Sequence, residues 1–250
     1  MRIVRFDEGG GACYGVLEGD CLYRLAGEPF NGLRGAGGPL ELHDVRLLAP
    51  TDPSKIVAVG LNYGDHAQEL GMPVPDEPVL FLKAPSTVLA PGGKVVYPEQ
   101  ASRVDYEAEM ALVMGRRARQ VPESEACQYV FGYTCALDMT ARNLQEKDGQ
   151  WTRAKNFDTF CPLGPWVETD LDPGDLAITL ELNGEVKQSS RTSQMIFGVH
   201  RLISFISGVM TLEPGDVILT GTPPGVGEVN RGDLIKVTIE GIGTLECAVA

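Results

Sequence analysis

The sequence predicts a β-rich α+β fold, with a small N-terminal β module in front of one larger domain. Short apolar segments bounded by Gly, Pro and Asn recur along the chain, and each has the length of a strand. Helical patterns are few and do not alternate regularly with the strands, which argues against a doubly wound sheet or a TIM barrel. The 250 residues are 43% hydrophobic and 22% charged, so the chain can bury a sizeable core.

The N-terminal segment reads as short strands followed by a glycine-rich stretch. We expect strands at residues 2–6, 12–17 and 21–25. Glu18-Gly19-Asp20 suits a hairpin-type turn between the last two. The stretch "GEPFNGLRGAGGPLEL" (27–42) is interpreted as a linker. We therefore assign residues 1–48 to the module and its linker, and 49–250 to the larger domain.

The larger domain carries most of the strand signals. Its expected strands are 55–60, 79–82, 94–97, 106–114, 133–137, 177–183, 217–220, 234–239 and 244–249. Asn183-Gly184 is a hairpin signal, and Pro-Gly-Asp turns at 173–175 and 214–216 precede apolar runs.

Four helices are predicted in this domain. The first is short, with Asn62 as its N-cap, Asp65 in its first turn and Gly71 at its end. The others are expected at 125–130, 140–147 and 194–207, the last capped by Ser193.

Charge and cysteine content exclude several classes of protein. The chain has 34 acidic and 21 basic residues, a net charge of -13 and no Lys/Arg-rich run, which argues against nucleic-acid or anionic-membrane binding. The six cysteines form no C-x-x-C pair, so we expect them to be reduced and structural. No apolar signal core and no run of about 18 apolar residues is present, so the expected compartment is the cytoplasm.

The stretch "VDYEAEMALV" places Asp105, Glu107 and Glu109 on one face of an extended chain. Carboxylates two residues apart lie roughly 6.8 Å from each other, and each pair repels by about 2 kcal/mol at an effective dielectric constant near 20. Either solvent at an exposed edge or a bound cation could offset this repulsion. The apolar continuation "MALVM" favours a strand that enters the core. An all-oxygen site would prefer Mg²⁺, then Mn²⁺ or Ca²⁺.

Asp138 is the candidate third ligand beside Glu107 and Glu109. It follows an apolar strand and precedes a polar helix, a usual place for a site residue. The alternative is that Asp138 only caps the helix at 140–147. We expect Asp105 to lie outside the ligand set or in solvent.

His66 and Glu69 are three residues apart on the first helix. They share one face, so the carboxylate can orient the imidazole as a general base. The alternative is a surface pair formed by chance. His43 and His200 are interpreted as structural.

Three cations and one loop complete the candidates. Lys83 and Lys155 could meet an anionic substrate group, and Arg142 could clamp a carboxylate, although each alone could form a surface salt bridge. "TGTPPGVG" (220–227) lacks the Walker and dinucleotide patterns, but its backbone N–H groups and Thr222 could hold an oxyanion.

Taken in order, these segments resemble the fumarylacetoacetate hydrolase family in its short bacterial form. The matching pieces run from about Lys55 to the C-terminus: "NYGDHAQE", "PVLFLKAPS", "VDYEAEMALV", "GYTCALDMTARNLQ", "AKNFDTFCPLGPW", "LNGE", "SQMIF" and "GTPPGVG". The first fifty or so residues match an accessory module that many bacterial members carry and the shortest acylpyruvases lack. The resemblance implies a rolled mixed β-sheet with a central site, and a homodimer.

The resemblance also assigns roles. It implies that Glu107, Glu109 and Asp138 bind Mg²⁺ or Mn²⁺, that His66 and Glu69 activate water, and that Lys155 lies beside the metal. The substrate-binding or supporting positions it implies are Lys83, Arg142, Gln145 and Thr222.

Our leading hypothesis is hydrolysis of a C–C bond in an acylpyruvate-type β-diketo acid, with a metal-bound enolate as the departing group. The alternatives are isomerisation or decarboxylation of an unsaturated 2-oxo dicarboxylate of the 2-hydroxyhepta-2,4-diene-1,7-dioate type from aromatic catabolism, or oxaloacetate decarboxylation. A non-enzymatic β-rich binding protein, with the cation as a structural staple, is the third possibility.

Overall fold

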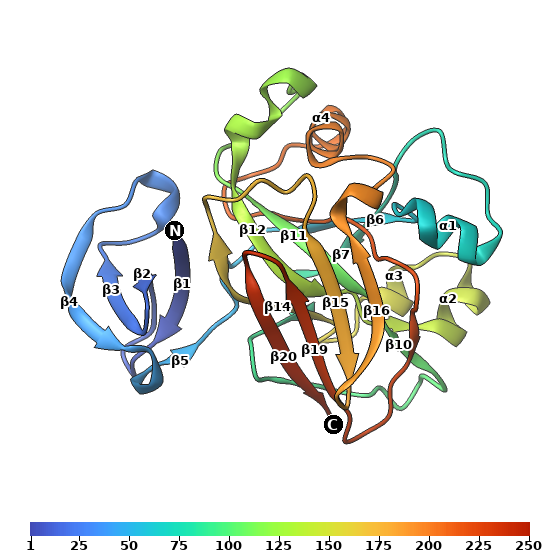
Figure 1. The fold of residues 1–250 in the computed structure, drawn as a ribbon, viewed down its shortest axis with the longest axis horizontal. Coiled ribbons are helices and arrows are strands. Elements are labelled where there is room, and N and C mark those ends of the chain that lie inside the picture. Colours follow the sequence, from blue (N-terminus) through green and yellow to red (C-terminus); the bar gives the residue numbers. More distant parts are fainter.

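The computed structural model describes residues 1–250 and contains three β-sheets, which confirms the β-rich α+β prediction (Figure 1). The largest sheet is mixed and has the order β4-β3-β2-β1-β14-β12-β11-β17-β6-β7, with β5 paired to β1 and β8 to β14. Its strands are β1 (Arg2–Asp7), β2 (Ala12–Glu18), β3 (Cys21–Leu25), β4 (Gly35–Glu41), β5 (Arg46–Leu47), β6 (Ile56–Gly60), β7 (Val79–Lys83), β8 (Val88–Leu89), β11 (Ala108–Met114), β12 (Val130–Leu137), β14 (Cys161–Glu168) and β17 (Val217–Leu219).

Two smaller sheets complete the β structure. The five-stranded sheet has the order β16-β15-β19-β20-β9, and the three-stranded sheet the order β13-β10-β18. Their strands are β9 (Lys94–Val95), β10 (Val104–Tyr106), β13 (Thr140–Ala141), β15 (Ala177–Leu182), β16 (Glu185–Arg191), β18 (Gly227–Glu228), β19 (Leu234–Ile239) and β20 (Gly243–Val249). β15 and β16 form the predicted hairpin, with Asn183 and Gly184 both at positive φ.

The helices are short. The α-helices are α1 (Gly64–Leu70), α2 (Arg142–Asp148), α3 (Thr152–Lys155) and α4 (Val199–Val209), and the 3₁₀ helices are η1 (Pro29–Asn31), η2 (Leu42–Asp44), η3 (Pro85–Thr87), η4 (Glu123–Tyr129) and η5 (Thr192–Gln194). None of them is long and apolar enough to cross a membrane.

The N-terminal strands lie to one side of the rest of the chain (Figure 1). β1 pairs with β14, so these strands extend the large sheet, and Val4, Phe6, Leu17 and Leu22 form their own apolar cluster. The linker prediction was wrong for residues 35–41, because this segment is β4 and pairs with β3. β4 lies at the edge of the sheet and is mostly exposed, so backbone pairing forms it without an apolar pattern.

Two helix boundaries also differ from the prediction. The helix expected at 194–207 begins only at Val199, after η5, and Ser193 donates to Asp175 Oδ1 (2.7 Å) instead of capping it. The helix expected at 140–147 begins at Arg142, because Thr140 and Ala141 pair with β10. Local polarity predicted the first residue of each helix, but contacts with distant segments determine where the helices begin.

β11 runs through the middle of the core and is buried along its whole length. Met110, Leu112 and Met114 join the main apolar cluster shared with the five-stranded sheet and α4, whereas Ala111 and Val113 join a second cluster on the other face. Because both faces are covered with apolar side chains, the strand ends are where polar chemistry can be placed. β6, β12 and β17 end, and β11 begins, on the same side of the sheet, where the strand ends lie together.

Asn62 links the segments that follow these strand ends, although the prediction that it caps α1 was wrong. Tyr63 is the N-cap residue, and the buried Asn62 side chain points elsewhere. Its Nδ2 donates to the carbonyls of Thr220 (2.8 Å) and Phe197 (3.0 Å), and its Oδ1 accepts from the Phe197 N–H (2.8 Å). Gly221 permits this close approach, since a Cβ there would lie 2.7 Å from Asn62 Cβ. Asn62 therefore fixes the start of α1 against the loop that follows β17.

Substituting Asn62→Ala should lower the free energy of unfolding by about 2–4 kcal/mol, because it leaves the buried Thr220 carbonyl and two part-buried backbone groups of Phe197 without partners. Urea denaturation measures this change. Asn143→Ala is the control: Asn143 accepts one exposed hydrogen bond, from the Ser102 N–H, and its loss should cost under about 1 kcal/mol. Equal destabilisation by both variants would contradict the role of Asn62.

Candidate active site

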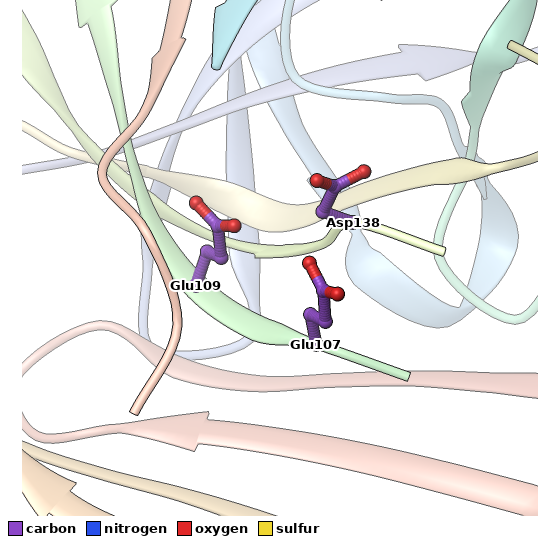
Figure 2. Close-up of side chains that lie close together, drawn as sticks. All are labelled: Glu107, Glu109 and Asp138. Carbon is purple, nitrogen blue, oxygen red and sulfur yellow. The ribbon is translucent and has the colours of Figure 1, made fainter. Parts of the chain in front are cut away.

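Three buried carboxylates converge at the strand ends where β11 begins and β12 ends. Glu107 lies in the one-residue break between β10 and β11, Glu109 lies near the start of β11, and Asp138 follows β12. One oxygen from each lies within 4.8 Å of the others, and Figure 2 shows the carboxylates directed toward one another. The interpretation of Asp105, Glu107 and Glu109 as a solvated strand face was wrong, since all three residues are buried.

The residues present fit a hard divalent cation. Mg²⁺–oxygen bonds of about 2.1 Å place two ligand oxygens at most about 4.2 Å apart, and the three carboxylate oxygens lie within 4.8 Å of one another. An all-oxygen, all-carboxylate set favours Mg²⁺, Mn²⁺ or Ca²⁺ over metals that prefer nitrogen or sulfur. Asp138 does not cap a helix: Ala141 precedes α2, and no side chain caps that end.

Two buried lysines lie against the carboxylates. Lys155 Nζ lies 2.8 Å from Glu107 Oε2 and 2.6 Å from Asp138 Oδ2, and Lys83 Nζ lies 2.5 Å from Asp138 Oδ1. Lys83 also donates to the Lys155 carbonyl (2.7 Å). The surface salt-bridge interpretation was therefore wrong for both lysines. The sequence left open whether solvent or a bound ion offsets the repulsion between the carboxylates. The two lysines of the protein itself offset much of it.

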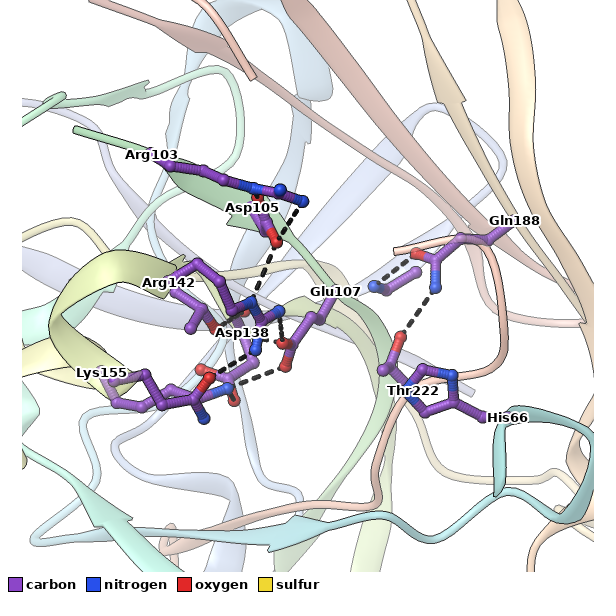
Figure 3. A network of polar contacts seen from close by, with 12 residues as sticks. His66, Arg103, Asp105, Glu107, Asp138, Arg142, Lys155, Gln188 and Thr222 are labelled. Carbon is purple, nitrogen blue, oxygen red and sulfur yellow. Dashed lines mark hydrogen bonds and ion pairs between the residues drawn. The ribbon is translucent and has the colours of Figure 1, made fainter. Parts of the chain in front are cut away.

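Arg142 joins the same cluster and links it to Asp105. Its Nη2 lies 2.7 Å from Glu107 Oε1 and its Nε lies 2.9 Å from Asp105 Oδ2 (Figure 3). Arg103 pairs with the other Asp105 oxygen at 2.7 Å, so Asp105 supports Arg142 and lies outside the converging carboxylates, as expected. Gln145 accepts from Arg142 Nη1 (2.5 Å). Three of the five guanidinium N–H groups are thus engaged, and two remain for a substrate carboxylate.

We call these eight side chains the charge cluster: Asp105, Glu107, Glu109, Asp138, Lys83, Arg103, Arg142 and Lys155. Although burial opposes it, Lys155 and Arg142 hold the pKa of Glu107 at about 2. Burial, with Asp138 and Glu107 nearby, raises the pKa of Glu109 well above its usual value. Glu109 has no cation in direct contact and accepts from the Gly221 N–H (2.6 Å). Glu109 is therefore the carboxyl of the three that most readily holds a proton before a cation enters.

A cavity of about 370 Å³ opens onto the charge cluster, and His66 and Thr222 lie on the opposite side of Glu107 from Lys155 (Figure 3). His66 Nδ1 lies 2.8 Å from Glu69 Oε2, as the spacing on α1 predicted. The carboxylate accepts from Nδ1–H, which leaves Nε2 of the neutral ring as a proton acceptor. The imidazole lines the cavity and is only 12% exposed, unlike a chance surface pair.

The loop after β17 binds carboxylates of the site itself. The N–H of Gly221 donates to Glu109, and the N–H of Gly225 donates to Glu69 Oε1 (3.1 Å). The predicted oxyanion-holding groups are thus already occupied at these two positions. Thr222 lines the cavity as expected, and its Oγ1 accepts from Gln188 Nε2 (2.9 Å). Its own O–H is left to donate into the cavity.

Sequence reasoning missed Gln188. This fully buried side chain of β16 holds the loop through Thr222 and the Pro223 carbonyl (2.8 Å), and accepts from the Ala108 N–H (2.9 Å) at the start of β11. Its partners lie 34 to 80 residues away, so no local pattern could have found it. His43 and His200 are exposed and do not line the cavity.

Comparison with known proteins agrees with this geometry. Residues 55–250 match the family described as fumarylacetoacetate (FAA) hydrolase C-terminal, and residues 1–50 match the Rv2993c-like N-terminal family. A structure titled 5-carboxymethyl-2-hydroxymuconate delta-isomerase, from Mycobacterium smegmatis, is 45% identical with a TM-score of 0.95, covering 100% of this chain and 99% of that one. One titled 2-hydroxyhepta-2,4-diene-1,7-dioate isomerase, from Mycobacterium marinum, is 44% identical with a TM-score of 0.94, covering 100% and 98%.

A more distant relative is oxaloacetate tautomerase fahd2 of Xenopus laevis mitochondria. It is 43% identical over 219 residues, which cover 82% of this chain and 69% of that protein. The family match spans most of the chain and confirms the resemblance in the sequence. The chain therefore belongs to the fumarylacetoacetate hydrolase family of enzymes.

Proposed function

We propose that this protein is a divalent-metal-dependent isomerase that interconverts a 2-oxo acid and its 2-hydroxy, double-bond-shifted form, with His66 moving the proton. The observation that carries the proposal is a cavity with a buried charge cluster on one side and a carboxylate-oriented imidazole on the other. Such a pairing suits reactions in which a proton leaves carbon and negative charge builds up on a neighbouring oxygen.

The charge balance of the cluster supports this class of substrate. With all groups ionised, four carboxylates face four cations, so the cluster is formally neutral. Glu107, Glu109 and Asp138 would hold Mg²⁺ or Mn²⁺, which stabilises negative charge on a substrate oxygen as a Lewis acid. The two added positive charges match the carboxylate and the enolate oxygen at the reacting end of a 2-oxo acid, which both candidate reactions share.

The protein's own residues would carry the proton transfer. His66 Nε2 takes a proton from the carbon next to the keto group, and the bonding electrons move onto the keto oxygen. Glu69 keeps the ring in the correct tautomer and stabilises the imidazolium that forms. Lys155, whose pKa its carboxylate partners raise against the effect of burial, adds positive charge at the metal end. The imidazolium then returns the proton to a different atom of the substrate.

The names of the relatives support isomerisation as the reaction. Two are named as isomerases, of 5-carboxymethyl-2-hydroxymuconate and of 2-hydroxyhepta-2,4-diene-1,7-dioate, and one as a tautomerase of oxaloacetate. Moving a proton needs the dyad and the enolate but no attacking water, so it asks less of the site than hydrolysis does.

Hydrolysis of an acylpyruvate is the second candidate, and one observation favours it. Lys155 and Arg142, the lysine and arginine that line the cavity, both lie against a carboxylate, while Val59, Leu70 and Met72 line its apolar part. A substrate with one carboxylate and an apolar acyl group suits this lining better than a dicarboxylate does. His66 would then take its proton from water that attacks the distal carbonyl.

Product analysis separates the two candidates. We expect a 2-hydroxymuconate-type dienedioate or the enol of oxaloacetate to convert to its isomer in the presence of Mg²⁺, with no carbon fragment released and no reaction in excess chelator. Ultraviolet absorbance and NMR follow the products. Pyruvate released from acetylpyruvate would instead support hydrolysis, and no Mg²⁺-dependent turnover of any of these acids would contradict both candidates.

His66→Ala should lower kcat by a factor of about 10²–10⁴, the usual contribution of a general base, and Glu69→Gln should lower it less. Neither variant should change Mn²⁺ affinity measured by calorimetry, because neither residue belongs to the charge cluster. His200→Ala, at an exposed position on α4, is the control. A His66→Ala enzyme with wild-type kcat would exclude the proposed proton transfer.

Lys83→Met should lower the free energy of unfolding of the metal-free protein by about 3–5 kcal/mol, because Asp138 loses a buried partner. Saturating Mg²⁺ should recover part of the loss, since the ion supplies positive charge to the same carboxylates. Thermal or urea unfolding with and without Mg²⁺ measures both effects. Lys236→Met, which breaks an exposed pair with Glu246, is the control and should change stability by less than about 1 kcal/mol. Equal stabilisation of wild type and Lys83→Met by Mg²⁺ would be evidence against the ion binding beside Asp138.

A further inference from the structure

We propose that the indole of Trp151 is a wall between two cavities and sets how long the distal group of the substrate can be. The inference rests on the proposed function for one point only, that the substrate is a 2-oxo acid bound at the charge cluster. It holds for either candidate reaction, because it concerns the far end of the substrate.

Trp151 lies between the cavity at the charge cluster and a second, larger cavity. The cavity of about 370 Å³ at the charge cluster and a second cavity of about 700 Å³ have only Phe81 and Trp151 in common among their lining residues. In the antiparallel pair of β6 and β7, Gly60 lines the first cavity and its strand partner Val79 lines the second. The chain likewise passes from Glu146 at the first cavity to Gln150 at the second, immediately before Trp151.

The indole is held in place by its neighbours. A Cβ on Gly60 would lie 2.9 Å from Trp151 Cζ3 and 3.0 Å from Cη2, so the ring packs directly on the glycine backbone. Phe81 meets the indole edge to face, with 5.1 Å between ring centroids. Trp151 lies between α2 and α3, and Arg153 pairs with Asp148 (2.7 Å) across this turn. The indole is thus fixed by packing on Gly60 and Phe81 and by its short connection between α2 and α3.

Phe81 links the wall to the charged end of the site. Lys155 Nζ lies 5.0 Å from the centroid of the Phe81 ring, whose edge-to-face partner is Trp151. Because both rings line the cavity beside Lys155, the proposal places the distal group of a 2-oxo acid held at the charge cluster against the indole. The second cavity has an apolar side formed by Val79, Leu80, Leu82 and Pro85. Removing the indole would join the cavities and admit a longer unbranched apolar chain.

Binding of oxamates measures the wall without relying on turnover. Oxalate and N-alkyl oxamates present the carboxylate and adjacent oxygen of a 2-oxo acid and do not react. With saturating Mg²⁺, calorimetry should give a wild-type affinity for N-hexyl oxamate at least about tenfold weaker than for N-propyl oxamate. In Trp151→Ala this penalty should disappear, while oxalate affinity stays within about twofold of wild type.

Two further variants keep the test decisive. Trp151→Phe retains an aromatic ring and should give an intermediate chain-length profile even if Trp151→Ala fails to fold. Leu82→Ala changes only the second cavity and should leave the wild-type profile unchanged. Normal oxalate binding with an unchanged chain-length profile in the Trp151 variants would overturn the inference about Trp151 and leave the proposed function standing. Absence of Mg²⁺-dependent oxalate binding to the wild type would overturn the proposed function and this inference with it.

Discussion

The structure depends on compensated burial of charge. Glu107, Glu109 and Asp138 come from two neighbouring strands and the segments beside them, and they are removed from water where β11 enters the core. A buried ion without a partner costs several kcal/mol, so the fold must bring cations to this point. Lys83 comes from β7, Arg142 from α2 and Lys155 from α3, so the charge cluster also ties these elements to the sheet. The chemistry of the site and the packing of the domain are satisfied by the same contacts.

The carboxylate end of the site and the His66 end are built differently. Glu109 stands on β11 and Asp138 directly follows β12, next to strands that cannot shift without disturbing two apolar clusters. His66 stands on a two-turn helix whose position depends on a few polar contacts: Asn62 to Thr220, Ser190 to Asp65 and Gly225 to Glu69. The imidazole is therefore held by contacts to one short helix, whereas the carboxylates stand in the buried core.

The sequence predicted the residues that short patterns place together, and failed where partners come from distant segments. The alternating acids at 105–109, the aspartate at a strand end and the i, i+3 spacing of His66 and Glu69 are local signals, and each led to the correct position. Lys83 lies 55 residues from Asp138, and Asn62 lies 158 residues from Thr220, so the cations seemed exposed and the asparagine seemed to be a cap. The break in the strand at Glu107 also escaped prediction, because β10 and β11 pair with different strands. Spacing along the chain describes the faces of one element, but only the tertiary fold describes what those faces meet.

The division of the site into a charged part and an apolar part helps to explain how one family can include isomerases, tautomerases and hydrolases. In the proposed function, the charge cluster would recognise only what these substrates share, a carboxylate beside an oxygen that takes up negative charge. Its cations are already paired with carboxylates, so they have little left with which to distinguish one 2-oxo acid from another. Discrimination must then come from the apolar side, where Leu70, Met72, Phe81 and Trp151 line the cavity. Apolar pockets select by size and shape more than by chemical group, and a difference of one methylene is worth only about 1–3 kcal/mol. A family can therefore keep its charged end unchanged and alter its substrate by changing a few side chains at the other end.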